Sequence, residues 1–347
     1  MRIILSKPSF SNYIGVVLIE RGSLTLAYVE VIAGLILLVG AGDVLIRGAV
    51  SIAENLGLSK LVIGLTVIAF GTSAPELVVG IDAAIAGVPT LALGNVVGSN
   101  IANILLVIGL PAVFYPFVCN STEVSRNYFI MLGGTALFML LCWMGPLTHF
   151  HATLLLILLI AFLVNSYKLG RLTEDQIQQD QRIADHAYQD LDELPEEPLK
   201  TPRATLYIIA GLIGLVYGAH ILVNGAVDIA RAFDISEAVI GLTIIAIGTS
   251  LPELVTAIIA ARKNHGDVAL GNVIGSNIFN LYAIMSGTAF VADIPIPQSF
   301  LSVDLWVMAL SSAALLPFIL WKIRFNRVIG LAFTGAYIYY LWTLSSS

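Results

Sequence analysis

Long apolar runs, separated by short polar stretches, recur along the whole chain. Most are about 20 residues long, enough for a helix to cross roughly 30 Å of hydrocarbon. The pattern predicts an all-α polytopic membrane protein with ten transmembrane helices. The predicted spans are 25–46, 59–85, 91–117, 128–146, 152–167, 204–223, 235–261, 268–291, 300–320 and 328–344.

One polar segment interrupts the apolar pattern between the fifth and sixth spans. It is dense in Asp, Glu and Gln, and it lacks the carboxylates spaced around a glycine that mark an EF-hand, so a solvated linker is expected. The predicted organisation is an N-terminal lead over 1–24, a first five-helix repeat over 25–167, the acidic loop over 168–203 and a second five-helix repeat over 204–347. We assign the lead no function.

Composition supports the membrane class. The chain is 58% hydrophobic and 12% charged with a mean hydropathy of +0.90, whereas soluble proteins carry roughly a quarter charged residues. Cys119 and Cys142 predict neither a disulfide framework nor a metal site. We expect membrane lipid as the surroundings, no cofactor, no nucleic acid and no obligate protein partner.

An internal repeat dominates the middle of each half. "GLTVIAFGTSAPELV" at 64–78 matches "GLTIIAIGTSLPELV" at 241–255, and "ALGNVVGSNIANI" at 92–104 matches "ALGNVIGSNIFNL" at 269–281. Both matches have an offset of 177 residues. About 27 of 43 aligned positions are identical, far beyond chance for two apolar segments. The two repeated segments extend over about 61–104 and 238–281.

The number of spans between the copies predicts how they are oriented. Five crossings separate each motif from its twin, and an odd number turns the second copy upside down. We therefore expect two inverted five-helix repeats related by a pseudo-two-fold axis, a layout typical of secondary transporters with midplane substrate sites.

Lys and Arg predict the orientation in the membrane. With the N-terminus outside, thirteen of them lie in cytoplasmic loops and four lie on the outer side. We expect a multi-pass protein of the cell (inner) membrane, with both termini outside and the loop 168–203 in the cytoplasm.

The first motif places a proline and an acid inside a predicted span. Pro75 has no N–H, so the carbonyl of Gly71 loses its helical partner, and a bent or locally open helix is expected. Thr72, Ser73 and Glu76 share one face of that helix. The twin face carries Thr249, Ser250 and Glu253.

The following span of each repeat adds a polar stripe with a four-residue spacing. The two stripes are Asn95, Ser99 and Asn103, and Asn272, Ser276 and Asn280. All these donors are carboxylate, amide or hydroxyl, a set that suits hard cations such as Na⁺ or Ca²⁺. Asn100 and Asn277 lie one position off the stripes, so we expect them to form hydrogen bonds between helices rather than to bind an ion.

Glu76 and Glu253 have no basic partner on these helices except near the helix ends. A lone carboxylate at the midplane costs roughly 3 kcal/mol or more, so the two acids are expected to share protons or to be neutralised by a cation. A kinked helix with a protonated glutamate explains one motif but does not require the inverted copy. Asp43 and Arg47, four apart in the first span, are expected to pair locally.

An intramembrane enzyme is not expected. It would need a nucleophile or an HExxH-like metal pair, and the sequence has neither. The two acids also lie in symmetric copies, whereas a catalytic pair needs distinct roles.

These residues resemble a known family. "GTSAPEL" with "GNVVGSN", and "GTSLPEL" with "GNVIGSN", resemble the two α-repeats of the cation/Ca²⁺ exchanger superfamily, and most closely its prokaryotic sodium/calcium exchangers. The resemblance covers residues 25–346. It implies five plus five helices, with an ion-binding core of four helices across which the first and sixth spans slide. It also implies Na⁺/Ca²⁺ antiport that exports Ca²⁺.

The resemblance also implies a set of ligands. The calcium site would use Glu76 and Glu253 with Thr72 and Thr249. The sodium sites would add the serines and two carbonyls, namely Ser73, Ser250, Ser99, Ser276 and the carbonyls of Ala69 and Ala246. Asn103 and Asn280 would complete the central position.

One departure from the family pattern affects the expected chemistry. Some relatives, including potassium-dependent exchangers, carry an aspartate where this chain has Asn280. The resemblance therefore points to a potassium-independent exchanger with two acids rather than three. H⁺/Ca²⁺ exchange, or exchange of another divalent cation, stays open as the alternative.

Overall fold

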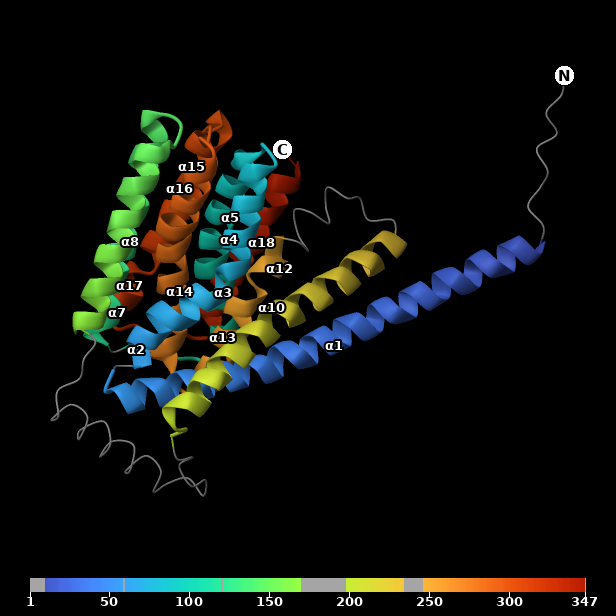
Figure 1. Cartoon of the computed structure of the whole chain (residues 1–347), viewed down its shortest axis with the longest axis horizontal. Helices are drawn as coiled ribbons and strands as arrows, with labels where there is room; N and C mark the ends of the chain where they lie inside the picture. Colours follow the sequence, from blue (N-terminus) through green and yellow to red (C-terminus); the bar gives the residue numbers. More distant parts are fainter. Residues whose placement is uncertain (1–9, 59, 120, 170–197, 234–245, 347) are drawn as a thin grey trace.

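The computed structural model describes residues 10–58, 60–119, 121–169, 198–233 and 246–346. Almost all of them are helical, and most of the helices form one bundle beside two long tilted helices (Figure 1). The first half contains α1 Phe10–Leu56, α2 Lys60–Ile63, the π-helix η1 Gly64–Ile68, α3 Ala69–Thr72, α4 Ala74–Ile85, α5 Pro89–Ala102, the π-helix η2 Asn103–Ile108, α6 Gly109–Phe114, α7 Thr122–Met144 and α8 His149–Leu169. The second half contains α10 Thr201–Ala232, α12 Ala246–Thr249, α13 Leu251–Arg262, α14 Gly266–Phe279, the π-helix η4 Asn280–Ile284, α15 Met285–Val291, the π-helix η5 Phe300–Asp304, α16 Leu305–Ala314, α17 Leu316–Leu320 and α18 Arg327–Ser346.

The helices have the length and composition of membrane spans. Within the described ranges, seven are long and apolar enough to cross a membrane, or eight when the bent pair Gly64–Thr72 and Ala74–Ile85 counts as one span. The fold is therefore that of a helical membrane protein, as predicted. The predicted span 235–261 begins outside the described residues, and α18, the predicted span 328–344, is not among the seven.

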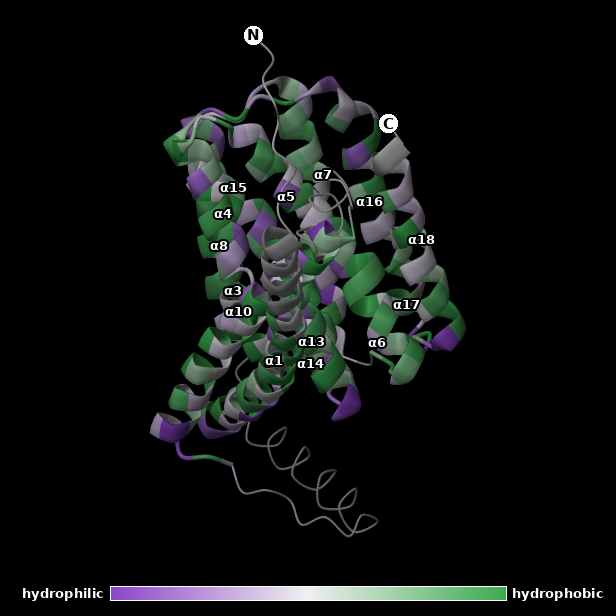
Figure 2. Ribbon diagram, turned by 90° about the vertical axis from the view of Figure 1, so that its right-hand side faces the viewer, coloured by the Kyte–Doolittle hydropathy of each residue, from purple (hydrophilic) through white to green (hydrophobic). Residues whose placement is uncertain are grey.

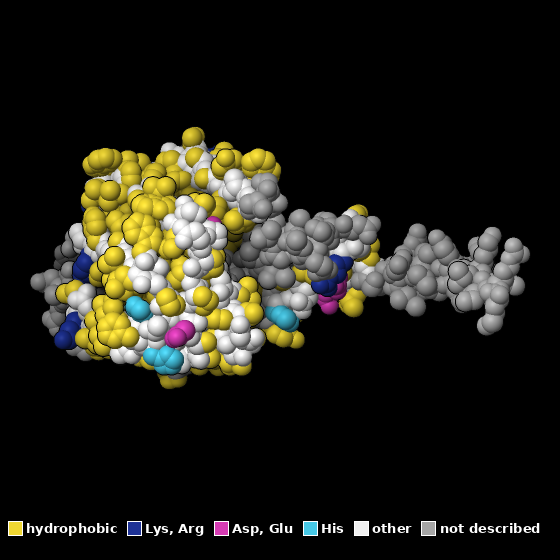
Figure 3. Space-filling view, turned by 90° about the horizontal axis from the view of Figure 1, so that it is seen from above, with side chains coloured by type: hydrophobic (Ala, Val, Ile, Leu, Met, Phe, Trp, Pro, Cys, Tyr) yellow, Lys and Arg dark blue, Asp and Glu magenta, His cyan; other side chains and the backbone are white. Residues whose placement is uncertain are grey.

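The surface agrees with a lipid environment. Large apolar side chains such as Phe150, Trp321 and Val328 are more than 70% exposed. Figure 2 shows hydrophobic residues along the helices, and Figure 3 shows one face covered mainly by hydrophobic side chains. In hydrocarbon such a surface costs nothing, whereas in water it would cause association.

The two long helices extend beyond their predicted ends. α1 and α10 run obliquely side by side (Figure 1), and residues 10–24, predicted as a lead, continue into α1. Their backbones approach closely at glycines, as is common in membrane helix pairs. A Cβ added at Gly211 would lie 2.7 Å from the Cβ of Leu45, and one added at Gly48 would lie 2.8 Å from the carbonyl oxygen of Ala204.

Most of the remaining helices form the bundle, and the repeat is visible in their bounds. α3, α4 and α5 begin and end 177 residues before α12, α13 and α14. The backbone between the paired helices is also the same, with φ −86° and ψ 5° at Ser73 and φ −89° and ψ 5° at Ser250. Similar sequences therefore form the same broken-helix unit twice. Of the seven spans, Pro89–Phe114 and Gly266–Val291 have the largest buried share, 83% and 94% of an 18-residue apolar window.

Asp43, which is expected to pair with Arg47 within the first span, also contacts basic residues of another helix. The Asp43 carboxylate lies 2.8 Å from the Lys263 ammonium and 3.7 Å from the Arg262 guanidinium, so Asp43 joins α1 to the end of α13. The twin positions, His220 and Asn224, interact within α10, with the Asn224 amide nitrogen 3.1 Å from His220 Nε2.

Candidate functional site

Each motif breaks its helix at a serine and begins a new helix beside an acid. Ser73 separates α3 from α4, and the helix bends there by 48° between Gly64–Thr72 and Ala74–Ile85. Because Pro75 has no N–H, it fits the first turn of α4, where that group would have no helical partner. The predicted bend at this motif is confirmed.

The break also gives the buried acids a favourable place. Glu76 lies in the first turn of the twelve-residue helix α4, and Glu253 lies in the first turn of α13, which has the same length. A helix N-terminus carries a partial positive charge that stabilises a carboxylate. Both side chains are 1% exposed. This second effect of the proline, besides the carbonyl that it leaves free, depends on where the new helix begins and is not apparent from the motif alone.

The two repeats meet at Glu253. Its Oε1 accepts a hydrogen bond from Ser73 Oγ at 3.1 Å and another from Ser276 Oγ at 3.5 Å. Ser73 belongs to the first motif, Ser276 to the polar stripe of α14, and both are buried. Residues 180 positions apart in the chain therefore share one polar cluster.

Several oxygen atoms in this region have no hydrogen-bond partner. Among the described residues, the buried and unpartnered oxygens of the predicted site are Glu76 Oε2, Glu253 Oε2, Ser250 Oγ, Asn103 Oδ1 and Asn280 Oδ1. A buried polar atom without a partner costs about 1–3 kcal/mol, and more when it is charged. All five are hard donors of the kind that hard cations bind.

The set of donors limits which ions fit. The described part of the chain contains no group of three or more His, Cys, Asp and Glu side chains that could hold a metal. The cluster therefore offers two carboxylates together with hydroxyls and amides. Such a set suits Na⁺ or Ca²⁺ and disfavours zinc or copper, which prefer imidazole and thiolate.

The remaining predicted ligands differ in their surroundings. Thr72 is buried and donates to Asn272 Oδ1 at 3.4 Å. The carbonyl of Ala69 accepts from the N–H of Ser73 at 3.0 Å, and Thr72 Oγ1, whose one hydrogen is shared with Asn272, lies 3.4 Å from it. Ser99 is buried on α5. Thr249 ends α12, and Ala246 begins it.

The two polar stripes are not equivalent at their first position. The Asn272 amide nitrogen donates to Thr256 Oγ1 at 2.9 Å, whereas the Asn95 amide nitrogen has no partner among the described residues. The reason lies in the sequence, since Thr256 has apolar Val79 as its twin. Thr256 is therefore not among the polar positions that the two repeats share, and a comparison of the repeats does not reveal it.

Both stripes end where the helix widens. Asn103 begins η2 and Asn280 begins η4, and π-turns of this kind often mark functional sites. Asn103 donates to Asn277 Oδ1 at 3.0 Å, and Asn280 donates to Asn100 Oδ1 at 3.1 Å. The predicted interhelical hydrogen bonds of Asn100 and Asn277 are confirmed.

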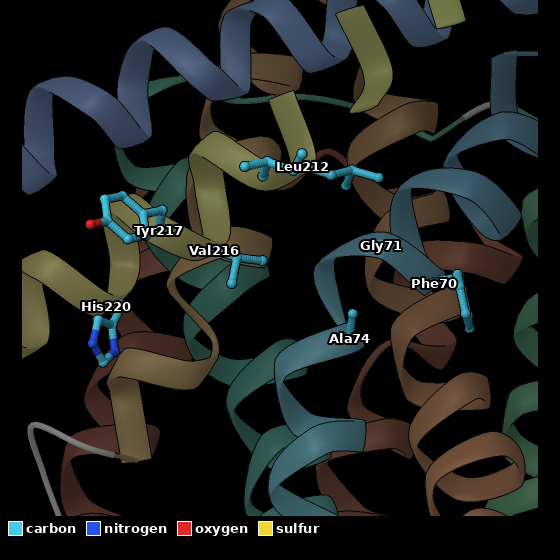
Figure 4. A pocket seen from close by; sticks show the side chains of 8 residues that line it. Phe70, Gly71, Ala74, Leu212, Val216, Tyr217 and His220 are labelled. Atoms are coloured by element: carbon cyan, nitrogen blue, oxygen red, sulfur yellow. The ribbon is translucent and has the colours of Figure 1, made fainter. Parts of the chain in front are cut away.

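A separate cavity of about 530 Å³ lies beside the helix break of the first repeat. Gly71 and Ala74 line it from the break, and Leu212, Val216 and His220 line it from α10 (Figure 4). Its walls are almost entirely apolar, so it does not provide the cation site itself. It places α10 next to the break.

The chain matches known proteins over nearly its whole length. A family model described as sodium/calcium exchanger protein matches residues 26–168 and 203–345. The putative antiporter CaxA of Alkalimonas amylolytica is 40% identical, with 92% of this chain and 99% of that protein covered. The inner membrane protein YrbG of Escherichia coli (strain K12) is 36% identical, with 91% and 96% covered. The sodium/calcium exchanger MaX1 of Methanosarcina acetivorans is 31% identical, with 92% and 99% covered.

A solved structure has the same fold. The sodium-calcium exchanger NCX_Mj, soaked with zero Na⁺ and Ca²⁺, matches with a TM-score of 0.78 and 31% identity. The match covers 92% of this chain and 99% of that one.

Proposed function

Because the chain belongs to the sodium/calcium exchanger family, we propose that it is a secondary active antiporter that exchanges Na⁺ for Ca²⁺ and exports Ca²⁺. The observation that carries this proposal is that five hard oxygen donors of the two repeats, one each from Glu76 and Glu253 among them, are buried without partners. Two relatives, MaX1 and NCX_Mj, are named as exchangers of these two ions, which agrees with the donor set.

The proposed architecture is ten spans in two inverted five-helix repeats. The match of helix bounds at an offset of 177 supports the repeat. A second bent span that ends with α12 and α13, together with α18, would bring the eight spans to ten. The five-span separation would then invert the second copy and place the two motifs face to face near the midplane.

We assign Ca²⁺ to the carboxylates of Glu76 and Glu253 with the hydroxyls of Thr72 and Thr249. One Ca²⁺ balances two carboxylates, which would otherwise repel each other in a buried site. Na⁺ would bind around the same acids. Its further ligands would be Ser73, Ser250, Ser99, Ser276, the carbonyls of Ala69 and Ala246, and the amide oxygens of Asn103 and Asn280.

Alternating access would come from movement of α1 and α10 across the bundle. Their close packing through Gly48 and Gly211 supports movement as one unit, because the two backbones are nearly in contact. We place the protein in the cell (inner) membrane, as the name of the Escherichia coli relative supports, with both termini outside and residues 168–203 in the cytoplasm.

A flux measurement tests the proposal. Purified protein in proteoliposomes loaded with Na⁺ is diluted into Na⁺-free buffer, and ⁴⁵Ca²⁺ uptake is followed. We expect rapid uptake that disappears when Na⁺ is equal on both sides. Uptake that ignores the Na⁺ gradient would rule out Na⁺/Ca²⁺ exchange.

Exchange of H⁺ for Ca²⁺, or of another divalent cation, is the second candidate. The 40% identical CaxA is named only as a putative antiporter, and buried glutamates can carry protons. A pH gradient that drives ⁴⁵Ca²⁺ uptake without any Na⁺ would select this function.

A further inference from the structure

Two buried hydrogen-bonded chains, each of three side chains, end at Asn103 and Asn280, the last residues of the two polar stripes. In the first, the amide nitrogen of Asn277 lies 3.7 Å from the sulfur of Met131 and also donates to the backbone oxygen of Asn100 at 3.4 Å. The Asn277 Oδ1 accepts the hydrogen bond from Asn103 at 3.0 Å. The Oδ1 of Asn103 has no partner among the described residues.

The second chain repeats the first at the twin positions. The Asn100 amide nitrogen lies 3.7 Å from the sulfur of Met308, and its Oδ1 accepts from Asn280 at 3.1 Å. The Oδ1 of Asn280 is again buried without a partner. All six side chains are at most 1% exposed. Met131 and Met308 are also 177 residues apart, although α7 and α16 lie outside the repeated motifs.

The chemistry of each chain fixes the direction of every amide in it. A thioether can only accept a hydrogen bond, so the methionine holds the NH₂ side of the next asparagine. Asn277 and Asn100 therefore present their oxygens, which accept hydrogen bonds from the NH₂ groups of Asn103 and Asn280. Because a carboxamide carries its oxygen opposite its nitrogen, Asn103 and Asn280 must turn their oxygens away from the asparagines that hold them, and both oxygens are buried without a partner.

We propose that Asn277 and Asn100 are positioning residues, each backed by a methionine, that hold the amide oxygens of Asn103 and Asn280 toward the transported cation. The proposal rests on the proposed function in one respect, namely that these two oxygens bind the ion. Without its partner, a stripe asparagine can turn its NH₂ group toward the cation, which replaces an attraction with a repulsion.

The test replaces Asn277 by leucine, which removes the oxygen that accepts from Asn103 and keeps a side chain of similar shape. Asn277→Leu is expected to raise the Ca²⁺ concentration for half-maximal binding by about 10- to 100-fold, the usual cost of losing a group that orients a metal ligand. Binding is measured by equilibrium dialysis of purified protein with ⁴⁵Ca²⁺. Monodisperse elution and an unchanged melting temperature establish that each variant is folded.

A second background separates positioning from packing. In Asn103→Asp protein both side-chain oxygens can bind the ion, so orientation no longer matters, and adding Asn277→Leu should have little further effect. In Asn280→Asp protein, Asn277→Leu should still cause the full loss of Ca²⁺ affinity, because Asn280 belongs to the other hydrogen-bonded chain. Asn100→Leu is the matched twin variant. Its loss of Ca²⁺ affinity should be relieved by Asn280→Asp and not by Asn103→Asp.

Two results would overturn the proposal: unchanged Ca²⁺ binding in Asn277→Leu, or the same fold-change in all three backgrounds. Failure of the proposed function is a different result. It would appear as wild-type proteoliposomes without Na⁺-dependent uptake, while the binding measurements would still decide the role of Asn277 and Asn100.

Discussion

Ser73, at the helix break of the first repeat, donates a hydrogen bond of 3.1 Å to Glu253, the buried acid of the second repeat. Glu253 thus accepts from the serine of the other motif, whereas Ser250 of its own motif has no hydrogen-bond partner among the described residues. The hydroxyls bound to Glu253 therefore come from both halves of the chain.

Removal of either acid should abolish exchange. Glu76→Gln or Glu253→Gln takes one charge from the pair that would neutralise Ca²⁺, and breaking a buried charge pair costs about 3–5 kcal/mol. We expect ⁴⁵Ca²⁺ uptake in Na⁺-loaded proteoliposomes to fall by at least about 100-fold. Glu76→Asp, which keeps the charge, serves as the control. Near-normal uptake by both Gln variants would contradict the assignment of the acids.

Loss of the hydrogen bond between Ser73 and Glu253 should weaken Ca²⁺ binding less than loss of an acid does. The effect of Ser73→Ala should also differ from that of Ser250→Ala at the twin position. A hydrogen bond to a charged group contributes about 1.5–3 kcal/mol, so Ser73→Ala should raise the half-saturating Ca²⁺ concentration by roughly 10-fold or more. Ser250→Ala is the matched variant, because Ser250 Oγ has no hydrogen-bond partner among the described residues. We expect it to alter Na⁺ dependence more than Ca²⁺ binding. Identical profiles for the two variants would argue against this asymmetry.

Acidification should weaken Ca²⁺ binding. A protonated glutamate is neutral and no longer attracts the ion, so protons and Ca²⁺ compete for Glu76 and Glu253. The half-saturating Ca²⁺ concentration, measured with the same pH on both sides of the vesicle, should rise as pH falls. The maximal rate at saturating Ca²⁺ should change less. An affinity independent of pH would show that protons do not enter the site.

The contact between α1 and α10 should be sensitive to a single methyl group. Gly211→Ala places a Cβ 2.7–2.8 Å from atoms of Leu45, including its backbone, and such overpacking costs typically about 1–3 kcal/mol. We expect a lower melting temperature in detergent. Gly40→Ala on α1 is the control, since its added Cβ meets no described atom within 4 Å. Equal melting temperatures for the two variants would contradict close packing at Gly211.

Much of the fold was accessible from the sequence because its causes are local. Apolar runs long enough to cross hydrocarbon predict the helices, and "GTSAPEL" with its twin predicts a broken helix in each half. The ends of the helices were less predictable. α1 begins at Phe10 and α10 reaches Ala232, both beyond the apolar runs that a span requires, because a helix can continue past the hydrocarbon and apolarity alone does not mark where it ends.

The sequence by itself determined which chemical groups are repeated: two acids, their neighbouring hydroxyls and two stripes of amides. Only the tertiary structure decided which of them share partners. It brought Ser73 into hydrogen-bond contact with Glu253 and left the Asn103 and Asn280 oxygens without partners. It also packed Met131 against Asn277 and Met308 against Asn100. The physical reason is that a hydrogen bond depends on distance and direction between helices far apart in the chain, and spacing within one helix carries no information about either.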